Sequence, residues 1–330
     1  MKERTMVPQA DFESYYGQQI IKTPTWKTPD VPLYLFLGGM AGASAVLAEG
    51  AALTGNRTLE RTTRLVAASG AGLGTVFLVH DLGRPMRFLN MLRVFKVTSP
   101  LSVGSFILAP FASLASAAAA SQVTGRLPRL GRLAGVGAAV FGPPLVTYTA
   151  ALLGNTAVPA WHEAHRELPF VFAGSGACAA GGMAMLLIPA AGNPPARQMA
   201  IAGAGVELVA TELLKRRLGM LAEPYEQGRS GRLMKTATRI TATAAVISTI
   251  GRRSRAVSAG CGAAYLVASA MTRFGVFEAG LASARDPKYT VVPQRERLAA
   301  RRAGTAAGEA HDHASHEQTG LDQVTETAAT

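Results

Sequence analysis

The sequence predicts an all-α membrane protein, a polytopic bundle of about eight transmembrane helices. Two observations predict this fold class. Apolar stretches recur from Val31 to about residue 277, separated by short arginine-rich loops, and a helix needs about 20 apolar residues to cross a bilayer. The composition agrees, because 48% of the 330 residues are hydrophobic and only 16% are charged. A membrane solvent excludes most classes of soluble enzyme.

The expected spans have uneven polarity. The first is interrupted only by Glu49, whereas the seventh carries Lys235 and Arg239. Pro143-Pro144 in the fourth could break that helix, although prolines also occur in ordinary spans. We expect an extramembrane segment at 1–30, a membrane-proximal basic segment at 278–297 and a disordered tail at 298–330. The spans between them are expected at 31–53, 63–80, 101–121, 132–153, 168–190, 196–215, 232–250 and 255–277.

The net charge of +12 does not indicate a nucleic-acid partner, because the basic residues lie in loops between the spans. Such residues set topology and contact lipid headgroups or an acidic partner. An even number of spans places both termini on one side, and more Lys and Arg residues flank the spans there than on the opposite side. The sequence therefore predicts a multi-pass protein of the cell membrane with both termini in the cytoplasm.

Several resident cofactors are excluded. The two cysteines, Cys178 and Cys261, lie inside apolar spans, where packing is the default role, and two thiolates cannot hold a four-ligand iron–sulfur cluster. A transmembrane haem protein needs histidines inside its helices, and only His80 touches a span. His162 and His165 lie in a loop and are a weak zinc signal. We expect no haem, iron–sulfur cluster or metal in this chain.

Polar groups converge at the end of the bundle that carries the termini. The second span ends there at His80 and Asp81, and the fourth carries Tyr148 about one turn before its end. On spacing alone Tyr148 is typical of an interfacial aromatic belt. His80 and Asp81 could simply end their helix in water. The alternative is that these groups share a reaction site.

A second polar group lies on the sixth and seventh spans. Glu207 falls near mid-membrane, Glu212 lies closer to the same end, and Arg239 lies at a depth similar to that of Glu212. Glu212 and Arg239 could form a structural salt bridge, but an ionisable residue inside a membrane is a functional hypothesis by default. Glu49 lies near the opposite face, where we expect it to be solvated or paired.

One block of sequence is distinctive. The segment HDLGRPMRF at 80–88, followed by LRVFK at 92–96 and SPLSVGS at 99–105, resembles the NrfD/polysulfide-reductase family of membrane subunits. The likeness covers residues 30–297. It includes YLFLGGMAG at 34–42, Tyr148-Thr149, NTAVPAW at 155–161, LPF at 168–170 and RDPKYT at 285–290.

The resemblance implies an eight-helix subunit of a molybdopterin-dependent oxidoreductase complex. In that family the subunit carries no metal centre and binds an exchangeable menaquinone or ubiquinone near one membrane face. A ferredoxin-like iron–sulfur subunit docks at that face, and a molybdopterin catalytic subunit acts on the soluble substrate. The resemblance thus makes this chain a quinone-binding membrane anchor that passes electrons to or from the quinone pool.

The resemblance also assigns residues. Tyr148 matches the family's quinone-bonding tyrosine, and Tyr34, Gly38 and Gly39 match the first-helix wall of its pocket. The first span has no Asn to supply a second polar contact, so His80 and Asp81 are the candidates. The basic loop after the second span is the expected docking surface for the iron–sulfur subunit, through Arg84, Arg87, Arg93 and Lys96.

Quinone chemistry fits these residue types independently. Reduction takes two electrons and two protons, so Tyr148 could donate to a quinone oxygen while His80 and Asp81 relay protons from the face. Glu207, Glu212 and Arg239 form a second candidate proton route. The same three residues could instead serve a small-solute or ion transporter, and a third reading is a passive anchor that holds other subunits without binding quinone.

Overall fold

The structure is a computed structural model that describes residues 20–251 and 253–301. Residues 21–285 form one compact unit. The described residues of the second unit include a helical stretch at 288–301. The segment expected at 1–30 lies mostly outside the described residues, as does most of the tail expected at 298–330. The expected division of the chain into domains stays a prediction.

Eight long helices make up the compact unit, and each overlaps one of the expected spans. They are α1 (Asp30–Leu53), α2 (Arg57–Leu82), α4 (Pro100–Thr124), α5 (Pro128–Gly154), α7 (Leu168–Leu187), α8 (Pro194–Leu218), α10 (Gly228–Ile250) and α11 (Arg255–Arg285). No strand occurs among the residues that the structure describes. The all-α prediction is confirmed.

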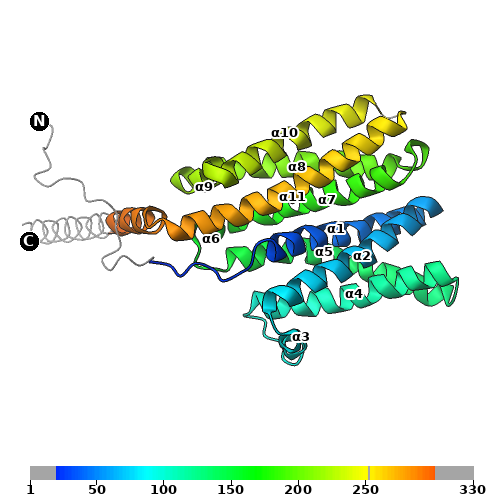
Figure 1. The fold of residues 1–330 in the computed structure, drawn as a ribbon, viewed down its shortest axis with the longest axis horizontal. Coiled ribbons are helices and arrows are strands. Elements are labelled where there is room, and N and C mark those ends of the chain that lie inside the picture. Colours follow the sequence, from blue (N-terminus) through cyan, green and yellow to red (C-terminus); the bar gives the residue numbers. More distant parts are fainter. Residues whose placement is uncertain (1–19, 252, 302–330) are drawn as a thin grey trace, which may run out of the picture. The chain divides into compact units, whose positions relative to one another are not determined.

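Short helices lie between the long ones. They are α3 (Pro85–Met91), α6 (Pro159–Glu163) and α9 (Glu223–Glu226), with 3-10 turns at Ala164–Arg166, Ala190–Gly192 and Gly219–Ala222. Figure 1 shows α3, α6 and α9 at the same end of the long helices, which we call the proximal end. The opposite end, where α1 ends and α2 begins, is the distal end.

Five of the long helices are long and apolar enough to cross a membrane by length and composition: α1, α2, α4, α5 and α7. The other three do not meet that standard because charged side chains interrupt them, as Glu207 interrupts α8, Arg239 α10 and Arg273 α11. A multi-pass membrane fold is therefore clear, whereas the count of eight spans stays a prediction.

Local sequence signals mark the helix ends. Proline stands in the first turn of α3, α4, α5, α7 and α8, where its missing N–H costs nothing. Gly83 and Gly125 follow α2 and α4 with φ of 71° and 68°, a backbone conformation that glycine adopts readily. Pro143-Pro144 do not break α5, which is continuous.

The long helices pack as two sets of four (Figure 1). The N-terminal helix set comprises α1, α2, α4 and α5, and the C-terminal helix set comprises α7, α8, α10 and α11. Helices α1 and α7 join the sets through close backbone approach: a Cβ on Gly176 would lie 3.0 Å from the Gly39 carbonyl oxygen. Within the N-terminal set, a Cβ on Gly42 would lie 2.5 Å from the Gly142 carbonyl oxygen. Small residues thus allow the contacts that hold helices together in lipid.

Candidate functional site

At the proximal end of the N-terminal helix set, a contact between His80 and Asp30 joins the end of α2 to the start of α1. His80 Nδ1 lies 2.6 Å from Asp30 Oδ2. The Asp30 side chain is only 7% exposed, whereas that of His80 is 72% exposed. A buried carboxylate thus orients an accessible imidazole.

The segment before α1 completes this corner. The backbone N–H of Lys27 donates to Asp81 Oδ1 at 2.8 Å, and Lys27 Nζ donates to the His80 carbonyl oxygen at 3.3 Å. Asp81 therefore binds the segment to α2, and Lys27 caps the end of α2 with a positive charge, as the helix dipole favours. Of the two α2 residues expected to relay protons, Asp81 is half-buried and bonded to Lys27, whereas His80 is exposed.

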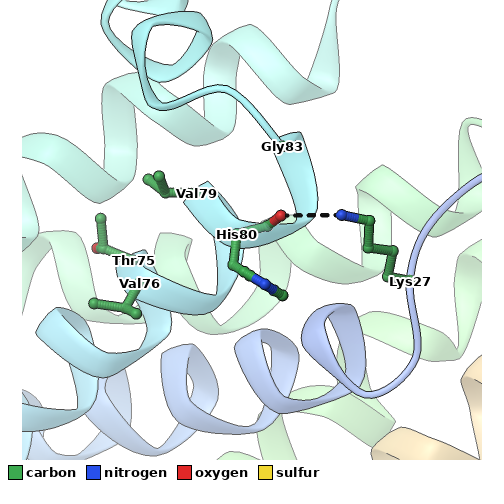
Figure 2. A pocket seen from close by; sticks show the side chains of 6 residues that line it. All are labelled: Lys27, Thr75, Val76, Val79, His80 and Gly83. Carbon is green, nitrogen blue, oxygen red and sulfur yellow. Dashed lines mark hydrogen bonds between the residues drawn. The ribbon is translucent and has the colours of Figure 1, made fainter.

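His80 lines an open pocket of about 500 Å³. Figure 2 shows its walls, with Thr75, Val76 and Val79 along α2, His80 and Gly83 at the helix end, and Lys27 opposite. Valine side chains and polar groups at one end would suit an amphiphile whose ring carries hydrogen-bond acceptors and whose tail is apolar.

Tyr34 and Gly38 lie deeper, where α1 faces α2. A Cβ on Gly74 would lie 3.6 Å from Tyr34 Cδ2 and 3.8 Å from the Gly38 nitrogen. Tyr34 is 2% exposed, and its hydroxyl has no hydrogen-bond partner among the described residues. A Cβ on Gly38 would meet nothing within 4 Å, although Gly38 is buried. An unpartnered buried hydroxyl calls for an explanation, and a ligand is one.

Tyr148 lies elsewhere. Its ring packs directly on Gly104 of α4. Val146, two residues earlier and thus on the other side of α5, is the residue that contacts Gly42 of α1. Tyr148 is also absent from the walls of the pocket beside His80. The place of Tyr148 in the expected site therefore stays a prediction.

Gly39, also expected to line the pocket, lies against a side chain from the C-terminal helix set. A Cβ on Gly39 would lie 2.8 Å from Arg273 Nη2. Arg273 is fully buried, donates from Nη2 to the Phe172 carbonyl oxygen at 2.8 Å, and stacks its guanidinium 3.8 Å above the Phe172 ring. Its Nε and Nη1 have no partner among the described residues.

Glu207 belongs to the same buried region. Thr272 Oγ1 donates to Glu207 Oε1 at 2.7 Å, while Glu207 Oε2 has no partner among the described residues. Glu212 and Arg239, grouped with Glu207 on sequence, lie apart from it. Glu212 is exposed and pairs with Arg216 on its own helix at 2.8 Å, and Arg239 is exposed on α10. The salt bridge between Glu212 and Arg239, one of the two readings of the sequence, is not formed among the described residues. Arg273 is the cation near Glu207.

The distal end of the N-terminal helix set holds a closed ion network. Arg64 Nη2 lies 2.9 Å from Glu49 Oε1 and 3.0 Å from Glu60 Oε1, and Arg132 Nε lies 3.6 Å from Glu49 Oε2. The expectation that Glu49 is paired near that face is confirmed. Opposite charges balance here, so the network fits a structural role.

The connection between α2 and α4 presents a mixed surface. Arg84, Arg87, Arg93 and Lys96 are all exposed, as predicted for a docking loop. The same connection also exposes apolar side chains that charge alone did not indicate, namely Met86 (66%), Leu89 (53%), Val94 (58%), Phe95 (55%) and Val97 (75%). Apolar residues with basic neighbours are typical of a surface that a partner protein covers.

The sequence model described as "Polysulphide reductase, NrfD" matches residues 21–214. The chain belongs to the NrfD family. No curated protein matches it. Members are polytopic helical membrane proteins, and this chain fits a membrane anchor of an oxidoreductase complex.

The match extends from the segment before α1 into α8, so it covers the N-terminal helix set with the pocket beside His80 and the α3 connection. Glu207 is within the matched residues, whereas Arg239 and Arg273 are outside them. The residues that place this chain in the NrfD family therefore include those that line the pocket beside His80.

Sequence reasoning passed over three residues of these sites: Lys27, Asp30 and Arg273. Asp30 directly precedes the first apolar stretch, and a carboxylate at that boundary could have been matched to His80 at the end of the next span. Arg273 is flanked by apolar residues in the last span. As an ionisable residue inside a membrane helix, it met the standard that selected Glu207.

Proposed function

We propose that this NrfD-family chain is the quinone-reactive membrane subunit of an oxidoreductase complex. It passes electrons between a ferredoxin-like iron–sulfur subunit and menaquinone or ubiquinone in the membrane, while a molybdopterin subunit acts on the soluble substrate. The observation that carries this proposal is the pocket beside the His80–Asp30 pair, in a family of oxidoreductase membrane subunits.

The quinone, when bound, accepts two electrons and two protons or releases them as quinol. In the proposal the valines of α2 hold the apolar part of the ligand, and the His80 imidazole donates a hydrogen bond to a ring oxygen. Asp30, buried and 2.6 Å from His80 Nδ1, fixes the ring orientation and stabilises the imidazolium. The exposed face of His80 exchanges the proton with water.

The position of Tyr34 supports an alternative depth for the ring. Its unpartnered hydroxyl and the unfilled space at Gly38 would accept a polar oxygen between α1 and α2. Tyr148 is the donor that the family resemblance favours, at the α4–α5 contact. The variants His80→Asn, Tyr34→Phe and Tyr148→Phe therefore separate three placements of the same ligand.

The test is quinone-linked turnover of the purified complex in liposomes. We expect His80→Asn to lower turnover by about 100-fold, the scale of a lost general acid or base. His162→Asn is the matched control, because His162 Nδ1 bonds the Gly154 carbonyl oxygen outside the pocket. Normal turnover in His80→Asn with loss in Tyr148→Phe would move the site to the α4–α5 contact. Normal turnover in all three variants would support a passive anchor.

The α3 connection is the proposed docking surface for the iron–sulfur subunit. Replacing Arg87 and Arg93 by Gln should loosen that subunit, and Phe95→Ala should add to the effect, because the surface combines charge with exposed apolar side chains. Arg126→Gln at the distal end is the control. Co-purification of an iron–sulfur and a molybdopterin subunit with the wild-type chain is the prior requirement, and unchanged retention in the triple variant would refute this docking site.

A second proposal concerns protons, and the unpartnered atoms of Glu207 and Arg273 favour it. We propose that Glu207 and Arg273 hold an intramembrane proton step coupled to turnover, while Glu212 and Arg239 lie outside it. Glu207→Gln should abolish proton uptake into liposomes while leaving quinone turnover measurable. Uptake of a solute or ion without any redox partner would instead favour a transporter at Glu207.

A further inference from the structure

A stripe of basic side chains runs along the outward face of α10. Arg232, Lys235 and Arg239 are exposed and spaced three and four residues apart, so they lie on one face of the helix. None of the three forms an ion pair with the residues that the structure describes. Figure 1 shows α10 at the edge of the C-terminal helix set, beside α8 and α11. The stripe therefore faces whatever surrounds the protein.

Arg239 is exposed on α10, and a cation without an anionic partner cannot face hydrocarbon cheaply. Long basic side chains reduce that cost by extending toward the nearer membrane surface. From their positions, Lys235 and Arg239 can both extend toward the proximal end and bring their charges close together. They need an anionic acceptor there, and the described part of the chain supplies none.

An apolar groove begins where the stripe ends. It has a volume of about 440 Å³ and lies between α10 and α11. From Arg239 it continues past Ile240, Thr243 and Ile247 on α10, and Val257, Gly260 and Ala264 form its other wall on α11. Because the two helices are antiparallel, this order places the charge at one end of the groove and hydrocarbon toward the distal end.

We propose that this surface binds one anionic phospholipid. Its phosphate contacts Lys235 and Arg239, and Arg232 contacts the headgroup from the proximal side. One acyl chain lies in the groove between α10 and α11. Basic pockets between membrane helices on the cytoplasmic side are a known way to hold such headgroups, and this is the side on which the sequence places the termini.

The dimensions favour a lipid over a protein helix. A helix with its side chains is about 10 Å wide, whereas the groove volume of about 440 Å³ suits one long acyl chain. A quinone headgroup is neutral and does not require three cations. The acyl chain of a zwitterionic lipid would fit the groove equally well, but its headgroup would not neutralise the basic stripe. The proposal therefore requires an anionic headgroup.

The experiment measures phosphatidylglycerol retained by the purified full-length protein after exchange into detergent containing equal phosphatidylglycerol and phosphatidylcholine. Lys235→Leu/Arg239→Leu removes both charges without a helix-breaking residue. At about fivefold per cation, retention of phosphatidylglycerol should fall roughly 25-fold. Arg126→Leu/Arg129→Leu, two exposed arginines at the distal end, is the control and should retain the lipid.

Gly260→Phe tests the groove separately. A Cβ on Gly260 meets nothing within 4 Å and the residue is exposed, so the ring fills the groove without disturbing the fold. We expect loss of retention in this variant as well. Loss only in the charge variant would overturn the acyl-chain site, and equal retention of both lipids by the wild type would overturn the anionic preference. Cross-linking of Thr243→Cys to another protein subunit in native membranes would replace the lipid by a partner helix.

Discussion

The two helix sets place their charges differently. In the N-terminal helix set, charged side chains lie at the ends: Asp30 with His80 proximally and Glu49 with Arg64 distally. In the C-terminal helix set, Glu207 and Arg273 are buried well inside their helices and have atoms without partners. The interior of the N-terminal helix set is therefore apolar, whereas the interior of the C-terminal helix set includes polar contacts.

This difference explains why the helices differ in hydropathy. All four helices of the N-terminal set are apolar enough to cross a membrane. In the C-terminal set, α7 is the one helix that meets the same standard. A polar residue costs little at a helix end, where water and headgroups reach it, and much at mid-membrane unless it is paired. The N-terminal set is therefore stabilised mainly by packing, whereas the C-terminal set also depends on specific polar contacts.

The largest effect should come from the interior of the C-terminal set. Arg273→Met removes the bond to Phe172, the contact with Gly39 and the cation near Glu207. We expect it to destabilise the protein by about 3–5 kcal/mol, as when one member of a buried charged group is removed. Unfolding of the reconstituted protein in SDS measures this. Recovery in Arg273→Met/Glu207→Gln would show that the stranded carboxylate is the cause, and an unchanged midpoint in the single variant would remove the contrast between the sets.

Packing should dominate in the N-terminal set. Gly42→Leu places a side chain against the Gly142 backbone, which cannot yield as a side chain can, so we expect a loss of about 1–3 kcal/mol. Gly72→Ala on α2 is the matched control, because nothing lies within 4 Å of its Cβ and alanine favours the helix. The same unfolding assay applies, and equal effects of the two changes would contradict close packing of α1 on α5.

The distal ion network should matter less than the interior pair. Glu49→Gln leaves Arg64 paired with Glu60, so we expect a loss of about 1–2 kcal/mol. Arg132, whose side chain is 46% exposed, can turn to water. The unfolding midpoints of Glu49→Gln and Arg273→Met, measured in the same assay, test this order. A larger loss of stability in Glu49→Gln than in Arg273→Met would contradict it.

The smallest effect should come from the exposed pair on α8. Glu212→Gln removes the contact with Arg216, but both side chains are more than half exposed. Exposed pairs of this kind contribute little to stability, so we expect no measurable change in unfolding and no change in proton uptake. A clear loss of uptake would return Glu212 to the proton route.

The sequence could predict the helices because each one satisfies its own backbone hydrogen bonds. Proline at helix starts, glycine after α2 and α4 and uninterrupted apolar stretches are local signals. The expected spans accordingly overlap the eight long helices. Gly70 and Gly74 of α2 also lie at a helix contact, since they face Ala41 and Leu37 of α1.

Partners in space were harder to predict. Depth along a helix follows from residue number, so His80, Tyr148 and Glu212 were rightly assigned to the proximal half. Rotation about each helix axis, which decides whether Tyr148 faces α4 or α1, depends on how all neighbours pack. For the same reason the sequence could match Glu212 to Arg239 in depth but could not show that they do not meet.

The membrane fold, the family and the end of the bundle at which polar groups collect follow from the order of residues, because hydropathy and motifs act locally along the chain. The contact of Asp30 with His80 and the approach of Arg273 to Gly39 could not be predicted in that way. Both arrangements depend on side chains far apart in the chain that meet only when the helices pack.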